Sequence, residues 1–187
     1  MRPTLHTARL LLEPLTLDHT DLLVELDSDP DVLHFIFGRG LSRAEVVDTW
    51  MPKRTRPDAD SRGIGYWVGS AGAEFLGWWC LNVDDNDETA AELGYRLHRA
   101  AWGHGYATEG SLALLAHAFD TVGLERVWAE TMAVNAGSRG VLARCGLRHV
   151  DTEVRQWEDP LPGWEQGEVR YEITREEWAT HAGRRES

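Results

Sequence analysis

The sequence predicts a single α+β domain, residues 1–187, in which helices flank a mixed β-sheet. Three observations predict this class. Apolar stretches joined by short polar turns fill residues 64–98, as expected for a β-meander. A glycine-containing loop, a helix and a further strand follow them. Two more strand-like stretches come near the C-terminus, and 187 residues are enough to bury a substantial core.

Composition and charge narrow the function classes. Hydrophobic residues make up 42% of the chain and charged residues 27%, which is ordinary for a soluble globular protein. The formal net charge of −12 argues against nucleic-acid binding, which requires a surplus of Lys and Arg. A negative field favours cationic partners such as amines, although the same charge is also explained by solubility alone.

The chain shows no sign of export or of a membrane span. Its N-terminus lacks an apolar segment of signal-peptide length, and no run approaches the roughly 20 apolar residues that a span needs. We therefore predict a cytoplasmic protein. Cys80 and Cys145 are too few for a disulfide framework, and their apolar surroundings indicate buried small hydrophobes. No cluster has metal-ligand spacing, so no metal is predicted.

The first elements alternate between strand and helix. Residues Thr7–Leu15 have the alternation of a short strand. Asp18 is placed to cap a helix that extends to about Leu26, with leucines on one face.

Ser42 and Glu45 form an S-x-x-E capping box for a second helix to about Trp50. Residues Pro52–Gly63 are polar and rich in Pro and Gly, which predicts a loop.

The meander comprises Ile64–Ser70, Glu74–Val83 and Ala90–His98. Because strand side chains alternate, the adjacent Trp78 and Trp79 are expected on opposite faces of the sheet. One of the two indoles is then able to line a pocket while the other packs in the core.

The remaining elements complete the sheet. A helix is predicted over residues 107–121, ended by Gly123, with an apolar face made by Leu112, Leu115, Ala116 and Phe119. Arg126–Thr131 is a predicted buried strand, and Ser138–Arg144 a helix ended by Gly146. Residues 147–157 and 167–174 are predicted strands around the loop Asp159–Gly167, before a short C-terminal helix.

The loop before the 107–121 helix is the main functional signal. Gly103 and Gly105 lie between a strand and a helix, an arrangement that presents backbone N–H groups to an anionic ligand. A nucleotide P-loop is excluded, since the chain has no Gly-Lys-Ser/Thr. A dinucleotide site fits poorly, since Thr108 occupies the third glycine position and the strand ends about six residues before Gly103, too far for the tight turn. A third candidate ligand is the pyrophosphate of coenzyme A, and a family resemblance favours it.

Two segments carry a family resemblance. The run W-G-x-G-Y-A-T-E at Trp102–Glu109 is followed about thirty residues later by N-x-x-S at Asn135–Ser138. Together with the opening T-x-R-L-x-L, these segments resemble the GNAT acyltransferase superfamily, and within it the RimJ/RimL-like branch. The resemblance covers nearly the whole chain, least well Asp27–Gly63. It departs from the family at Ala100, where Gln or Arg is common.

The resemblance implies a GNAT-like fold with two splayed strands, and acetyl-CoA as the acyl donor. Backbone groups around the glycine loop would hold the pyrophosphate, aided by the helix dipole, and Tyr95 and Leu97 would offer backbone groups to the pantetheine. The predicted donor-binding residues are Tyr95, Leu97, Trp102, Gly103, His104, Gly105, Tyr106, Ala107, Thr108, Asn135 and Ser138. From the residues alone, Asn135 and Ser138 are equally well explained as a turn and a helix cap.

The implied reaction is direct transfer of an acetyl group to a primary amine of a small molecule or a protein N-terminus. Ser138 is implied as the acid that protonates the leaving thiolate. Glu92, on the strand that leads to the donor site, is the first choice for the base, with Glu158 or a water path as alternatives. Asp85, Asp87 and Glu88 would attract a cationic acceptor, unless they are simply a solvated turn.

The acceptor itself is not identified by the sequence. Trp78, Trp79, Trp157, Trp164 and the loop Pro52–Gly63 are able to line its pocket. Two other functions stay open: a non-catalytic acyl-CoA-binding module of the same fold, and a dinucleotide-dependent oxidoreductase. The family is compatible with a homodimer.

Overall fold

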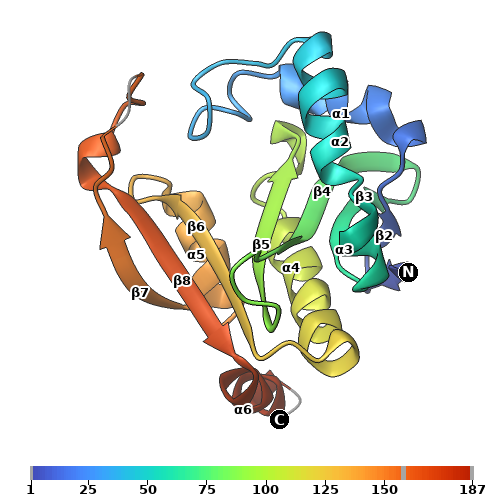
Figure 1. Ribbon diagram of the computed structural model, residues 1–187, viewed down its shortest axis with the longest axis vertical. Coiled ribbons are helices and arrows are strands. Elements are labelled where there is room, and N and C mark those ends of the chain that lie inside the picture. Colours follow the sequence, from blue (N-terminus) through green and yellow to red (C-terminus); the bar gives the residue numbers. More distant parts are fainter. Residues whose placement is uncertain (1, 157–158, 186–187) are drawn as a thin grey trace.

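A computed structural model describes residues 2–156 and 159–185 and confirms a mixed sheet flanked by helices (Figure 1). Within these residues the sheet has the strand order β1-β2-β3-β4-β5-β6-β8-β7. The strands are β1 (Leu5–His6), β2 (Leu11–Pro14), β3 (Gly65–Ala71), β4 (Glu74–Val83), β5 (Ala90–Leu97), β6 (Arg126–Met132), β7 (Arg148–Glu153) and β8 (Glu168–Thr174).

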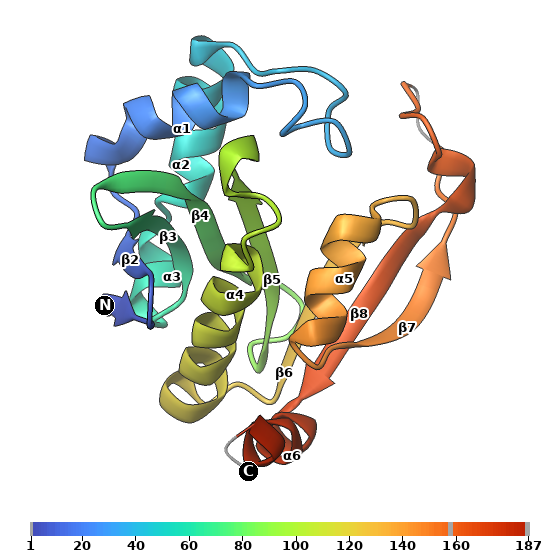
Figure 2. The same cartoon turned by 180° about the vertical axis from the view of Figure 1, so that it is seen from behind.

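Helices cover both faces of this sheet, and Figure 2 shows α4 and α5 together on one of them. The longer helices are α1 (Thr20–Ser28), α4 (Tyr106–Ala116), α5 (Ala136–Arg144) and α6 (Arg175–Arg185). The shorter helical segments are η1 (Leu17–His19), η2 (Glu45–Trp50), α2 (Met51–Arg54), α3 (Pro57–Ser61), η3 (Arg99–Ala101), η4 (His117–Val122) and η5 (Trp164–Gln166).

The alternation along β4 divides the apolar side chains between two cores. Trp79 is fully buried with Leu114 and Leu115 of α4 on one face. Trp78 is buried on the other face, with Leu26 of α1. The predicted opposite orientation of the two tryptophans is confirmed, and each of them is core.

The strands β5 and β6 diverge in the middle of the sheet, and this divergence positions the functional site (Figure 1). They form the parallel pair of an otherwise antiparallel sheet. Their register covers only Ala90–Arg126, Ala91–Val127 and Glu92–Trp128. Beyond Glu92 the two strands separate, so backbone groups on their facing edges are free of each other. The predicted splay is confirmed.

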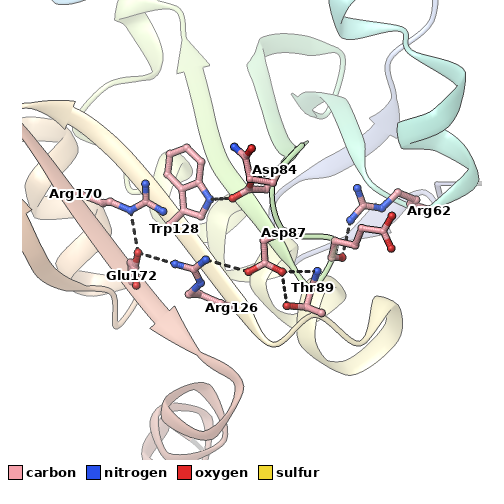
Figure 3. A network of polar contacts seen from close by, with 10 residues as sticks. Arg62, Asp84, Asp87, Thr89, Arg126, Trp128, Arg170 and Glu172 are labelled. Atoms are coloured by element: carbon pink, nitrogen blue, oxygen red, sulfur yellow. Dashed lines mark hydrogen bonds and ion pairs between the residues drawn. The ribbon is translucent and has the colours of Figure 1, made fainter.

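A polar network surrounds the end of β5 and β6 at which the two strands still pair (Figure 3). Trp128 Nε1 donates to Asp84 Oδ2 at 3.0 Å, and Arg126 bonds to Asp87 and Glu172 at 3.1 Å each. Arg170 lies over the Trp128 ring at 4.1 Å. The network ties the β4–β5 turn to β6 and β8, so the strands diverge from a fixed point.

Three predicted details are wrong for identifiable reasons. Residues Pro52–Gly63 are mostly helical, because Pro57 begins α3 and Pro52 is the second residue of α2, positions in a first helical turn where proline's fixed φ is favourable. The predicted apolar face of the 107–121 helix is only half right: Leu115 and Phe119 are buried as predicted, Leu112 and Ala116 are partly buried, and Leu114 and Ala118 are buried in their place.

The first helix also starts differently. Thr16, and not Asp18, precedes its first turn, and the Thr16 backbone N–H donates to His19 Nδ1 at 3.0 Å. The predicted Ser42–Glu45 capping box is confirmed, since Ser42 N donates to Glu45 Oε2 at 2.8 Å and Glu45 N to Ser42 Oγ at 3.3 Å.

Candidate active site

The loop between β5 and α4 is shaped by two left-handed glycines. Gly103 has φ +76° and Gly105 has φ +81°, values that L side chains rarely adopt. A Cβ at Gly103 would meet no atom within 4 Å, so its backbone borders open space. The first backbone bond of α4 runs from Glu109 N to Gly105 O at 3.0 Å. The N–H groups of Tyr106, Ala107 and Thr108 therefore begin the helix without a helical partner, the usual geometry of an anion site.

Trp102 contributes to this loop differently from expectation. Its backbone N–H donates to Arg99 O at 3.0 Å and is not available to a ligand. Its indole Nε1 donates to Leu97 O at 2.9 Å and closes the loop back onto β5. Trp102 thus shapes the cradle, and the outward N–H groups come from the residues after it.

A salt-bridged hairpin supports the glycine loop from outside. Arg9 donates to Glu109 Oε2 at 2.6 Å and to the carbonyl of His104 at 3.0 Å, and its guanidinium lies 4.5 Å from the Tyr106 ring. Thr7 Oγ1 also donates to Glu109, at 2.6 Å. Although partial burial acts in the opposite direction, these bonds lower the pKa of Glu109. The side chain at the helix start therefore stays ionised and pins the loop to β1 and β2.

A cavity of about 650 Å³ opens beside this support. Arg144 of α5 lines this cavity together with residues at the start of α4, so a cationic side chain lies on the same surface. Its lining comprises His6, Thr7, Ala8, Gly105, Thr108, Glu109, Leu112, Ala113 and Arg144. Sequence reasoning missed Arg9 and Arg144, because no local pattern shows that three distant segments meet here.

Asn135 and Ser138 lie at the start of α5, the helix that follows β6 in the chain. Asn135 is the N-cap, and its Oδ1 accepts from Ser138 N at 3.0 Å. The expectation that Ser138 caps the helix is wrong, because Asn135 already occupies that position. The Ser138 hydroxyl is instead 2.9 Å from the Tyr95 hydroxyl of β5. The structure brings these three predicted residues together.

Glu92 lies on the opposite face of β5 from Tyr95, at the point where the strands separate. Burial raises the pKa of its carboxyl, while the bond from Asn82 Nδ2, at 3.4 Å, acts in the opposite direction. The nearby Glu130 raises it further. A carboxyl held in this way accepts a proton more readily than an exposed glutamate does.

Further carboxylates gather on the β6–β8–β7 side of the sheet. Glu130, Glu153 and Glu168 bond to the single cation Arg155 at 3.2, 2.8 and 2.7 Å. Three carboxylates around one guanidinium leave a local surplus of negative charge. The predicted acidic turn is used otherwise, since Asp87 is paired with Arg126 and Asp85 lies 3.5 Å from Arg56.

Among the remaining residues considered in the sequence are two that the structure does not describe and the two cysteines. Trp157 and Glu158 lie outside the described residues. Cys80 and Cys145 are buried and form no disulfide, and burial raises the pKa of the Cys80 thiol to about 12. A thiol so protected from water and from ionisation is a poor nucleophile.

Comparison with known proteins identifies the family. A model of the acetyltransferase (GNAT) domain matches residues 9–148. The FsC-acetyl coenzyme A-N(2)-transacetylase of Aspergillus fumigatus is 43% identical over 187 aligned residues, which cover 95% of this chain and 78% of that protein. The chain belongs to the GNAT family of acetyltransferases. As a GNAT acetyltransferase it uses acetyl-CoA as its acyl donor.

Solved structures show the same fold. The spermidine N-acetyltransferase of Vibrio cholerae, in complex with CoA and spermine, has a TM-score of 0.77 at 15% identity and covers 92% of this chain and 99% of its own. RimL, an acetyltransferase of ribosomal L7/L12 solved with coenzyme A, has a TM-score of 0.75 at 18% identity, covering 90% and 95%. Within the described residues, no helix has the length and apolar character to cross a bilayer.

Proposed function

We propose that this protein transfers the acetyl group of acetyl-CoA directly to a primary amine of a small molecule, with Glu92 as the base and Ser138 as the acid. The observation that carries the proposal is the divergence of β5 and β6 after Glu92. It puts Glu92 on one face of the opening and Ser138, held by Tyr95, on the other.

The donor fits the glycine-loop side of the opening. The outward N–H groups at the start of α4 and the open space at Gly103 suit a pyrophosphate. Arg144 adds positive charge beside it, in a protein whose net charge is −12, whereas Arg9 is paired with Glu109 and supports the loop. The free edge of β5 beyond Glu92 suits the amides of pantetheine. The bound donor supplies a thioester, and the glycine loop and the edge of β5 hold this thioester in place.

The chemistry requires three proton movements. An acceptor that arrives as an ammonium ion first loses one proton to water, because only the neutral amine has the lone pair needed for attack. The amine nitrogen then attacks the thioester carbon and gives a second proton to Glu92. The carbon–sulfur bond then breaks, and the sulfur takes the hydroxyl proton of Ser138, which water restores. Holding amine and thioester together supplies much of the rate enhancement, so no covalent enzyme intermediate is needed. The burial of both cysteines is consistent with that route.

The acceptor in this proposal is a small amine of the kind named for the Aspergillus relative. That relative is an N(2)-transacetylase of FsC, and it aligns with almost the whole of this chain. The carboxylates near Glu92 favour an acceptor that arrives as a cation. A cytoplasmic location and membership of the RimJ/RimL-like branch remain predictions.

A panel of amines tests the proposal. Free-thiol release from acetyl-CoA is measured with FsC, with spermidine and with peptides that have free N-termini. Saturable release with FsC, at least tenfold faster in kcat/KM than with the other amines, is the expected result. Equal or faster release with the peptides would instead assign a protein N-terminus as the acceptor. Thermal stabilisation by acetyl-CoA without release with any amine would contradict the proposed transfer.

A further inference from the structure

Within the described residues, the side-chain hydrogen bond that we find to Ser138 across the diverging strands comes from the Tyr95 hydroxyl. Tyr95 comes from the separated half of β5, and Ser138 from the first turn of α5. Its hydroxyl lies 2.9 Å from Ser138 Oγ and 3.3 Å from the Ser138 carbonyl oxygen. The Tyr95 hydroxyl thus donates to the Ser138 carbonyl oxygen and also lies within hydrogen-bond distance of the Ser138 hydroxyl, where either oxygen is able to donate.

We propose that Tyr95 is a positioning residue for acetyl transfer, which orients the Ser138 hydroxyl and stabilises negative charge on its oxygen when the thiolate is protonated. The inference deepens the proposed function and rests on it. As Ser138 gives its proton to sulfur, the Tyr95 O–H donates to the Ser138 oxygen, and water then returns the proton. Tyr95 keeps its own proton throughout.

The environment of Tyr95 suits a donor that does not ionise. The side chain is partly buried against the core formed with α4, and this burial raises the pKa of its phenol. Ser138 itself is held at its backbone by the Asn135 cap. The backbone position of Ser138 is therefore fixed by α5, and the direction of its hydroxyl is set by Tyr95.

A matched tyrosine that contacts the same helix, α5, gives the control. Tyr171 of β8 is buried, and its hydroxyl accepts from Arg139 Nε of α5 at 3.2 Å. Arg139 follows Ser138 directly in the chain. Tyr95→Phe and Tyr171→Phe each remove one tyrosine hydroxyl that contacts α5 from a strand. Of these two hydroxyls, that of Tyr95 contacts Ser138 and that of Tyr171 contacts Arg139.

The experiment measures kcat, the dissociation constant of acetyl-CoA and the melting temperature of both variants, together with Ser138→Ala and the Tyr95→Phe/Ser138→Ala double variant. Tyr95→Phe is expected to lower kcat by about tenfold and to leave acetyl-CoA binding within about twofold, because hydrogen bonds to charged groups are the stronger ones. Tyr171→Phe is expected to leave kcat unchanged. The double variant is expected to be no slower than Ser138→Ala, because Tyr95 acts through the Ser138 hydroxyl and has no effect on turnover once that hydroxyl is absent.

The outcomes separate the two proposals. If Ser138→Ala slows turnover but Tyr95→Phe does not, the role of Tyr95 is overturned and the acid role of Ser138 stands. The role of Tyr95 is also overturned if the losses from the two changes multiply, or if Tyr171→Phe lowers kcat equally. If Ser138→Ala turns over like the wild type, the acid assignment itself fails.

Discussion

At the scale of single residues, Glu92 combines a cost in stability with a benefit in chemistry. Its carboxyl is buried beside Glu130, and both influences raise its pKa. A carboxyl whose pKa is raised by folding stabilises the protein at low pH, and this contribution is lost as the pH rises through the raised pKa. The ionised form of Glu92 therefore opposes folding, while it is also the form that takes a proton from the amine.

Replacement of Glu92 by Gln should separate these two effects. We expect kcat to fall by about 10²-fold or more, as for the loss of a general base, while the melting temperature at neutral pH is unchanged or higher. In the wild type, kcat should rise with pH through the raised pKa of Glu92, and this limb should be absent from the variant. The matched Glu74→Gln, at an exposed site that begins β4, should alter neither. A variant with full kcat would exclude Glu92 as the base.

The backbone at Gly103 gives a second prediction at this scale. Gly103→Ala should cost roughly 1–2 kcal/mol through the positive φ and raise the acetyl-CoA KM several-fold, since its Cβ projects into the open space at the loop. Gly72, in the β3–β4 turn, has φ +61° and equally open surroundings. Gly72→Ala should therefore show a similar loss of stability at an unchanged KM. Equal KM values in the two variants would remove Gly103 from the donor site.

At the scale of elements, a buried ion cluster joins α1 and α2 to the sheet. Asp27 at the end of α1 is fully buried and bonds to Arg54 of α2 at 2.8 Å and to Arg96 of β5 at 2.5 Å. The two guanidinium groups lie 5.2 and 5.0 Å from the centre of the Trp78 ring. Loss of the carboxylate would leave two buried cations together.

We predict that Asp27→Asn lowers the free energy of unfolding by about 3–5 kcal/mol, as for other broken buried ion pairs. Asp21 lies on the same helix and forms an exposed ion pair with Arg43, which provides the comparison. Asp21→Asn should cost less than about 1 kcal/mol. Chemical denaturation of both variants checks this, and equal costs would show that the cluster does not hold α1 and α2 in place.

The elements also show where sequence reasoning succeeds and where it fails. Periodicity located the strands from Gly65 to Leu97 to within a residue or two, because their apolar alternation is long and bounded by polar turns. The predicted loop at Pro52–Gly63 is wrong, because Pro52 and Pro57 lie in the first turns of α2 and α3 and do not interrupt them. Local composition alone does not distinguish the two uses of proline.

At the scale of the whole molecule, the site depends on contacts between segments that are far apart in the chain. The motifs at Gly103–Thr108 and Asn135–Ser138 were visible in the sequence because each is local. The support of Glu109 by Arg9 and the contact of Tyr95 with Ser138 were not visible, since they join residues 100 and 43 positions apart. The splay of β5 and β6 is what makes these separate motifs into one site.

The measurement that tests direct transfer most sharply is the initial-rate pattern with acetyl-CoA and the best amine, both varied. Transfer within a complex of protein, donor and amine predicts double-reciprocal lines that intersect, and no acetylated protein in the mass spectrum when acetyl-CoA is supplied alone. Parallel lines, together with an acetylated form of the protein that an added amine discharges, would contradict the account. They would show that a side chain carries the acetyl group before it reaches the amine.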